Sequence, residues 1–136
     1  MTVLVVEPGY APYEKTIPHD VDAMQKIVGG WITAIYPYKE PVGIVANDDG
    51  LLLGMEFNRS IEGGYGGLVG TFFVCGLTED SFCSLPPDQM ERFKKKFHKA
   101  EILVGFRGSE PVTLKVEPKQ KDSTPEKQRK PLSPER

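Results

Sequence analysis

Short apolar segments separated by turn-forming residues fill residues 1–80. These segments are rich in β-branched and aromatic residues, and Pro, Gly, Asn and Asp lie between them, which is the pattern of β-strands with tight connections. The segment LVGTFFVCGL, residues 68–77, is apolar throughout and is expected to form a central strand covered on both faces. The predicted strands are residues 2–6, 13–17, 31–38, 42–46, 51–55 and 68–77.

Two segments have the spacing of amphipathic helices. Residues 21–28 carry apolar side chains at a helical period, follow the favourable N-cap residue Asp20, and end at Gly29. The second segment opens with the prolines of Ser84-Leu85-Pro86-Pro87, which are tolerated in a first helical turn. Its expected buried stripe consists of Met90, Phe93 and Phe97.

The order of these elements predicts an α+β domain. Short connections favour a single, mainly antiparallel sheet of about six strands, and we expect both helices to pack on one face of it. Residues 101–106 and 112–117 are expected to add a peripheral hairpin. The domain should span residues 1–116. Residues 117–136 are rich in Pro, Lys, Glu and Ser, and we expect a disordered, charged tail there.

The segment 42–59, VGIVANDDGLLLGMEFNR, contains the most informative pattern in the chain. Asn47-Asp48-Asp49-Gly50 has turn-forming residues between two apolar runs, which predicts a hairpin over residues 42–55. The polar pair Asn58-Arg59 follows this hairpin. A guanidinium presents a planar set of donors that suits a carboxylate or phosphate, so the pair is a candidate anion site. The alternative is structural, with Asn58 in a turn and Arg59 paired to a carboxylate.

A glycine-rich segment, residues 60–67, follows, and its Gly63-Gly64-Tyr65-Gly66-Gly67 could bind a phosphate through backbone N–H groups. It lacks the Lys-Ser/Thr ending of a P-loop, and a strand is expected after it, so a plain surface loop is the alternative. The candidate ligand-binding or partner-binding residues are Asn58, Arg59, Asn47, Asp49, Tyr36, Gly64 and Gly66.

Charge is distributed unevenly along the chain, although the formal net charge is only −2. Residues 1–91 contain 4 Lys and Arg against 13 Asp and Glu, whereas residues 92–116 contain 7 against 2. This basic segment could contact nucleic-acid phosphates, or it could be the solvated face of a helix. The candidate basic patch consists of Arg92, Lys95, Lys96 and Lys99.

Residues with catalytic chemistry are present but are not arranged in a known pattern. Glu79-Asp80 and Asp48-Asp49 are adjacent acids, which usually share one solvated environment. His19 and His98 lack metal-ligand spacing, and the two cysteines, Cys75 and Cys83, form no CxxC pair. We therefore expect no metal, no cofactor and, on balance, no enzymatic activity. Without a disulfide framework, signal-peptide pattern or membrane-length apolar run, a cytoplasmic location is expected.

Several segments match one family in order along residues 2–97. The chain contains LVVEPG, IVGGWITAIYP, VANDDGLLLG followed by Asn58-Arg59, GTFFVCGL, and SFCSLPPDQMERFKKKF. Together they resemble the domain-of-unknown-function family 3846, found in bacteria, phages and conjugative elements. The resemblance implies a host-interaction or counter-defence role on a mobile element and assigns no catalytic residue.

Three functional hypotheses follow. The first is a small non-enzymatic protein that binds a protein partner or a small anionic ligand. The second is a domain that binds or hydrolyses a nucleotide-like anion through Asn58, Arg59 and the glycine-rich segment. The third is nucleic-acid binding through the basic second helix. The oligomeric state and the identity of the partner stay open.

Overall fold

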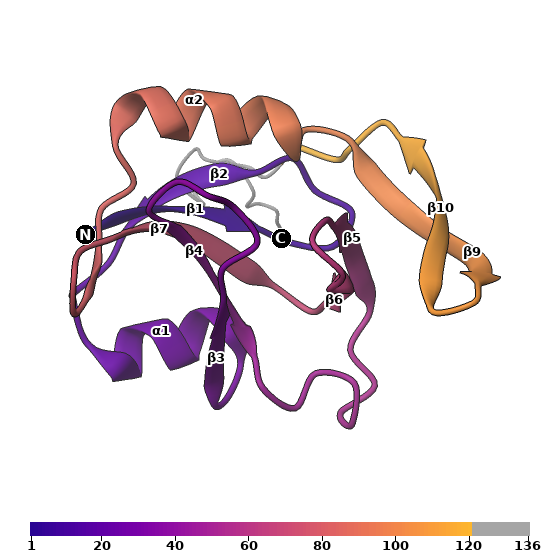
Figure 1. Cartoon of the computed structure of the whole chain (residues 1–136), viewed down its shortest axis with the longest axis horizontal. Helices are drawn as coiled ribbons and strands as arrows, with labels where there is room; N and C mark the ends of the chain where they lie inside the picture. The colour runs from indigo at the N-terminus through magenta and orange to yellow at the C-terminus, as the bar shows by residue number, and fades with distance from the viewer. Residues whose placement is uncertain (121–136) are drawn as a thin grey trace, which may run out of the picture.

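A six-stranded antiparallel sheet forms the centre of the computed structural model, which describes residues 1–120. Five strands lie in the order β2-β1-β7-β4-β3, and the short β8 pairs with β7 (Figure 1). This confirms the predicted α+β class and its mainly antiparallel sheet. The strands are β1 Thr2–Val6, β2 Tyr13–Thr16, β3 Ile32–Ile35, β4 Val42–Asn47, β7 Phe72–Leu77 and β8 Phe82–Cys83.

The two helices cover opposite faces of this sheet, so the prediction that both lie on one face is wrong (Figure 1). Helix α2, Pro87–Lys96, packs on the face that contains Leu4 and Val74, whereas α1, Val21–Val28, packs on the face that contains Val5. The reason is that β1 and β7 are apolar on both faces. Each face of the central strands therefore needs a helix to exclude water.

Helix α1 is bounded as its sequence predicts. The Asp20 carboxylate accepts a hydrogen bond of 2.8 Å from the Ala23 backbone N–H, and Gly29 ends the helix in a left-handed conformation with φ of 84°. The capping bond satisfies one of the backbone donors that an α-helix leaves without a partner in its first turn.

Asp20→Ala is expected to lower the free energy of unfolding by about 1 kcal/mol, because the Ala23 N–H loses its capping acceptor. Urea denaturation followed by circular dichroism measures the loss. Asp22→Ala is the matched control, since Asp22 lies in the same first turn and the structure gives it no capping bond. Equal losses for the two variants would show that the cap contributes nothing beyond the charge of an acid near the helix N-terminus.

The predicted hairpin over residues 42–55 is half wrong. Strand β4 forms, but residues 51–55 form no strand. Both edges of β4 are already occupied, by β3 and by β7, so the segment that follows cannot pair with it. Local bonds use its backbone instead: Leu53 N–H donates to Asp49 O at 2.9 Å, and Met55 N–H donates to Gly50 O at 3.0 Å.

The next two strands form a separate small sheet, β5 Phe57–Ile61 and β6 Gly66–Val69. The glycine-rich segment is therefore the turn of a hairpin and not a long loop. The single strand predicted over 68–77 is divided between β6 and β7 at Gly70, whose φ of 76° takes the chain out of an extended conformation.

The predicted peripheral hairpin is confirmed as β9 Ala100–Arg107 and β10 Glu110–Val116, and it projects to one side of the domain (Figure 1). The chain then returns to the body, where Lys119 exchanges two backbone hydrogen bonds of 2.9 Å with Gly9 and Ala11. Residues 121–136 of the predicted tail lie outside the described residues.

Candidate functional site

Arg59, the leading binding candidate, lies inside the protein. It projects from β5 and has 0% exposed surface. Its Nε and Nη2 donate to the Phe97 carbonyl at 3.2 and 2.7 Å, Nη2 also donates to Tyr10 O at 2.8 Å, and Nη1 donates to Asn58 Oδ1 at 2.8 Å. Burial lowers the pKa of Arg59 to about 10, so the guanidinium stays charged at neutral pH.

Asn58 completes this network and is equally buried, with 0% exposed. Its Nδ2 donates to Val6 O at 2.9 Å and to Gly70 O at 2.8 Å, while its Oδ1 accepts from Arg59. The pair therefore connects β5 to the end of β1, to the start of β7 and to the end of α2. The hydrogen-bond acceptors of Arg59 are backbone carbonyls and the Asn58 amide oxygen, and the carboxylate expected for the structural alternative, that of Glu101, acts on the guanidinium through its charge. These hydrogen bonds and the complete burial of Arg59 reduce its availability to an external anion.

Asn47 and Asp49 occupy the turn that follows β4. Asn47 is 7% exposed; its Nδ2 donates to Val28 O at 3.1 Å, and its Oδ1 accepts from the Asp49 N–H at 2.7 Å. The Asn47 side chain therefore joins the end of α1 to the loop after β4 and has a structural role. Asp49 lines a hollow of about 390 Å³ together with Leu51 and Leu52.

The remaining candidate residues lie away from the Asn58–Arg59 pair and from the turn after β4; they are Tyr36, Gly64 and Gly66. Tyr36 is 54% exposed and lines a groove of about 650 Å³ beside α1 and β8. Gly64 is an exposed residue of the β5–β6 turn, and Gly66 lines a polar hollow of about 370 Å³ under the β9–β10 hairpin. The structure thus distributes the proposed ligand residues over the interior, an exposed turn and three separate hollows.

The groove beside Tyr36 contains a serine–histidine contact that sequence spacing cannot reveal, because 62 residues separate the two. Ser81 Oγ lies 3.1 Å from His19 Nε2, and the same nitrogen lies 2.6 Å from Phe82 O. A carbonyl only accepts, so Nε2 must carry the proton. In this arrangement it cannot remove the proton of Ser81, and a hydroxyl needs such a base to become a nucleophile.

The cysteine thiols also differ from activated nucleophiles. Cys75 is 0% exposed in β7, and burial raises its pKa to about 12, so its thiolate is not populated at neutral pH. Cys83 is partly buried in β8, and both cysteines are free thiols. Among residues 1–120, His, Cys, Asp and Glu side chains form no group of three that could hold a metal ion.

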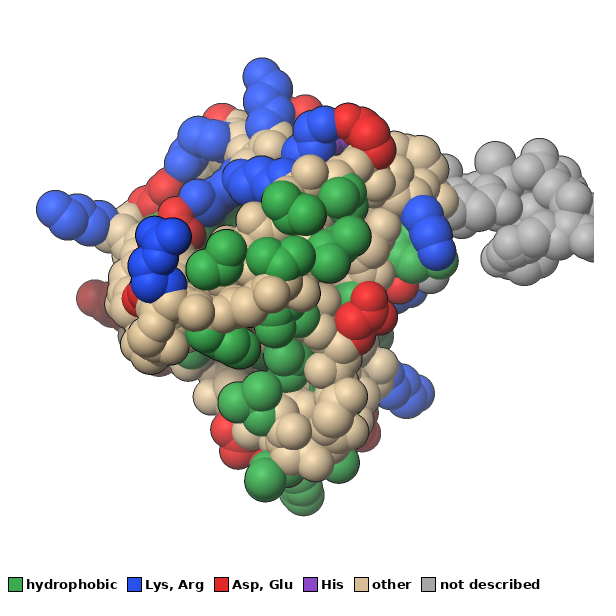
Figure 2. Space-filling model, turned by 90° about the vertical axis from the view of Figure 1, so that its right-hand side faces the viewer, with side chains coloured by type: hydrophobic (Ala, Val, Ile, Leu, Met, Phe, Trp, Pro, Cys, Tyr) green, Lys and Arg blue, Asp and Glu red, His purple; other side chains and the backbone are tan. Residues whose placement is uncertain are grey.

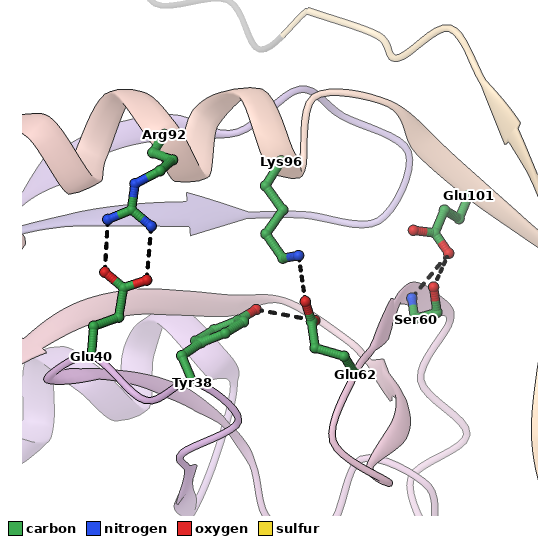
Figure 3. A network of polar contacts seen from close by, with 7 residues as sticks. All are labelled: Tyr38, Glu40, Ser60, Glu62, Arg92, Lys96 and Glu101. Atoms are coloured by element: carbon green, nitrogen blue, oxygen red, sulfur yellow. Dashed lines mark hydrogen bonds and ion pairs between the residues drawn. The ribbon is translucent and has the colours of Figure 1, made fainter.

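Most of the predicted basic patch on α2 and the segment after it is neutralised within the chain. Arg92 binds both oxygens of Glu40, each at 2.7 Å, and Lys96 binds Glu62 at 2.5 Å (Figure 3). The hydrogen bonds from Arg92 hold the pKa of Glu40 below its usual value. Lys99 pairs with Glu117, which leaves Lys95 as the one member without an ion pair in the described part of the chain. Among the described residues, these ion pairs reduce the number of free cations that could contact phosphates.

The apolar surface that sequence reasoning missed lies at the turn after β4. Leu51, Leu52 and Leu53 are 83%, 88% and 61% exposed. The backbone of Trp31, itself 71% exposed, lies beside the start of this loop, where its carbonyl accepts from Asp48 N–H at 2.8 Å. We call Trp31, Leu51, Leu52 and Leu53 the leucine tip. Its sequence signal is three consecutive leucines between a turn and Gly54, without the alternation of a half-buried strand.

Comparison with known proteins identifies a family but no described activity. A family model described as "Domain of unknown function (DUF3846)" matches residues 1–98, which include every element up to the end of α2. The β9–β10 hairpin lies beyond the matched segment. The chain matches no curated protein and no solved structure. Within residues 1–120, no helix is both long and apolar enough to cross a membrane.

Proposed function

The chain belongs to the DUF3846 family, and we propose that it is a non-enzymatic binding module that inserts its leucine tip into an apolar pocket of a protein partner. The observation that supports this function is the exposure of three successive leucines at one turn, up to 88% for Leu52. Single exposed apolar residues are common on protein surfaces, but a contiguous group is typical of an interaction site.

The free energy gained when a partner covers the leucine tip is large enough to drive binding. Burial of a leucine side chain contributes about 1.5–3 kcal/mol relative to full exposure. Trp31 adds a residue type that often dominates binding energy at protein interfaces.

The charges around the tip define the chemistry of the partner. Asp48 and Glu56 are exposed on either side of the leucines, and Asp49 is partly exposed beside them. A basic rim around an apolar pocket would complement this arrangement. The same acids would be repelled by an anionic membrane surface, which favours a protein over a lipid surface as the binding partner.

We further propose that a phage or mobile element encodes the protein and that its partner is a host protein. Its role would then be host interaction or counter-defence. The family resemblance supports the setting, and the free thiols of Cys75 and Cys83 fit a reducing cytoplasm. Two findings reduce the support for the rival functions. The donors of Arg59 are bound to carbonyls, and most of the basic patch is ion-paired.

Serine substitution of Leu51, Leu52 and Leu53 together is expected to weaken partner binding at least about 10-fold, since polar hydroxyls cannot replace the buried apolar area. The wild type is first used to capture a protein from host lysate. The affinity of that purified protein for wild type and variant is then measured by calorimetry. Trp31 is the chain's single tryptophan, so its emission should shift to shorter wavelength as the partner covers the tip.

The matched control is Val21→Ser, which changes an apolar side chain that is 54% exposed at the other end of α1. It should leave the affinity and the emission shift unchanged. Equal affinity of the triple-serine variant and the wild type, or a partner whose binding leaves Trp31 emission unaltered, would count against the leucine tip as the contact.

A further inference from the structure

The central sheet has two outer strands, β2 and β3, and they differ in how well they resist pairing with a further strand (Figure 1). β2 contains Glu14 and Lys15 and lies between Pro12 and Pro18. Charged residues and prolines are the usual protection of an exposed edge strand. β3 has the sequence Ile-Thr-Ala-Ile, without a charge, a proline or a bulge. β3 is therefore the edge that is open to another strand.

The ladder between β3 and β4 shows which backbone groups of β3 point outward. In an antiparallel ladder, alternate residues direct both their N–H and their C=O toward the partner strand. Asp48 N–H donates to Trp31 O at 2.8 Å, so the backbone groups of Trp31 point toward the β4 side. By alternation, those of Ile32, Ala34 and Tyr36 point away from β4. Within residues 1–120, no other residue bonds to these outward groups.

An apolar groove lies beside this open edge. Ile32 and Tyr36 line a groove of about 650 Å³ together with Leu77 and Phe82. Hydrophobic side chains also gather over the β9–β10 hairpin (Figure 2), but none of them lines this groove. A strand added to β3 would direct every second side chain toward the groove. In such a contact the backbone bonds provide affinity, and the groove selects apolar side chains.

Acidic side chains lie at both ends of the β3 edge. Glu79 and Asp80 line the groove together with Tyr36, at the end of β3. Asp48 and Asp49 follow β4 beside the start of β3. None of these four acids forms an ion pair in the described part of the chain, and the groove lining contains no Lys or Arg. A strand with basic residues at both ends would complement these charges.

The charges favour a partner protein over a second copy of this chain. In a two-fold pair of β3 strands, the start of one strand meets the end of the other. Asp48 and Asp49 of one copy would then approach Glu79 and Asp80 of the other, and like charges repel. Residues 121–136 do not supply the strand either, because they contain three prolines and lack an alternating apolar pattern.

We propose that an extended segment of a partner protein adds to the edge of β3 as a further antiparallel strand. The backbone groups of Ile32, Ala34 and Tyr36 bind its main chain, and its alternate apolar side chains enter the groove. Lys or Arg residues at both of its ends face the acids. This contact is separate from the leucine tip and does not depend on the function proposed for it.

A model peptide tests the added strand. The probe is fluorescein-labelled acetyl-Lys-Lys-Val-Thr-Val-Thr-Val-Lys-Lys-amide, and its fluorescence anisotropy is followed as the full chain is added up to about 500 µM. We expect saturable binding. Valines opposite Ile32, Ala34 and Tyr36 share their face of the sheet and direct their N–H groups toward β3, whereas the threonine N–H groups point away. N-methylation of the valines should therefore weaken binding at least about 10-fold. N-methylation of the threonines is the matched control and should leave binding unchanged.

A proline variant tests the same edge from the side of the protein. Ala34→Pro removes an outward N–H without removing a bond to β4, and should weaken peptide binding at least about 10-fold. Thr16→Pro is the matched control, because Thr16 is an outward position of β2: its neighbour Ile17 bonds to Met1 across the ladder. It should bind the peptide like the wild type. Replacing the four lysines of the probe by glutamates should abolish measurable binding, because the acids at both ends then repel it.

A wild type that does not bind the lysine-containing probe would overturn the proposal. So would equal affinities of the parent and valine-methylated peptides, a comparison that leaves the protein unchanged and does not depend on the folding of a variant. Self-association of the wild type that Ala34→Pro abolishes would assign the edge to a second copy instead. The variant with serine at positions 51, 52 and 53 should bind the probe like the wild type, and loss of binding there would assign the probe to the leucine tip.

Discussion

Replacing Arg59 by alanine is expected to lower the free energy of unfolding by about 3–5 kcal/mol. The side chain is fully buried and donates to carbonyls of Phe97 and Tyr10 and to Asn58 Oδ1. Without the guanidinium these acceptors lose their donors, and a buried polar group without a partner loses the hydration it would have in water. The same substitution also leaves a cavity the size of the Arg59 side chain.

Urea denaturation measures this loss, and two variants show its origin. Arg59→Lys keeps the charge but lacks the planar set of donors, so it should recover only part of the stability. Arg92→Ala removes an exposed arginine that binds Glu40 at the surface and should cost far less. A loss for Arg59→Ala as small as that of Arg92→Ala would show that the buried network does not hold the fold together.

The sequence could predict most strands and both helices, because local patterns determine them. The capped helix after Asp20, the apolar stripe of Phe93 and Phe97, and the final hairpin each depend on residues close in the chain. The placement of the helices on opposite faces was not predicted. It depends on which neighbours β1 and β7 acquire in the sheet, and those pairings join residues that are far apart in sequence.

The candidate site was also predicted only in part from the sequence. Asn58 and Arg59 stand out in the sequence as a polar pair among apolar strands, and the structure gives the pair a central position. Whether it faces water or the interior could not be predicted, since its partners are the carbonyls of residues 6, 10, 70 and 97. A backbone carbonyl is available at every residue, so no sequence pattern identifies the one that accepts a distant side chain.

The exposed apolar groups were missed for a different reason. A run of leucines normally indicates the core, and the leucine tip was therefore assigned to a strand. Only the occupied edges of β4 force residues 51–55 out of the sheet. The exposed apolar residues of β9 and β10 were also not predicted, because alternation in residues 102–106 predicts a strand without showing which side the body covers.

The second large effect is expected for Phe93→Ala, which should lower the free energy of unfolding by about 3–5 kcal/mol. Phe93 is 2% exposed on the buried side of α2. Its ring lies 5.1 Å from the Tyr38 ring and 6.3 Å from the Phe97 ring, between centroids. Truncation removes these contacts and leaves a cavity between α2 and the sheet that rigid neighbours cannot fill. Urea denaturation at low protein concentration measures the loss.

Phe106→Ala is the matched control, because the same side chain is removed from a position that is 65% exposed. At low concentration it should change stability by less than about 0.5 kcal/mol. A large loss for Phe106→Ala would mean that its ring contributes to the fold despite its exposure, and equal small losses at both positions would mean that α2 contributes little to the core.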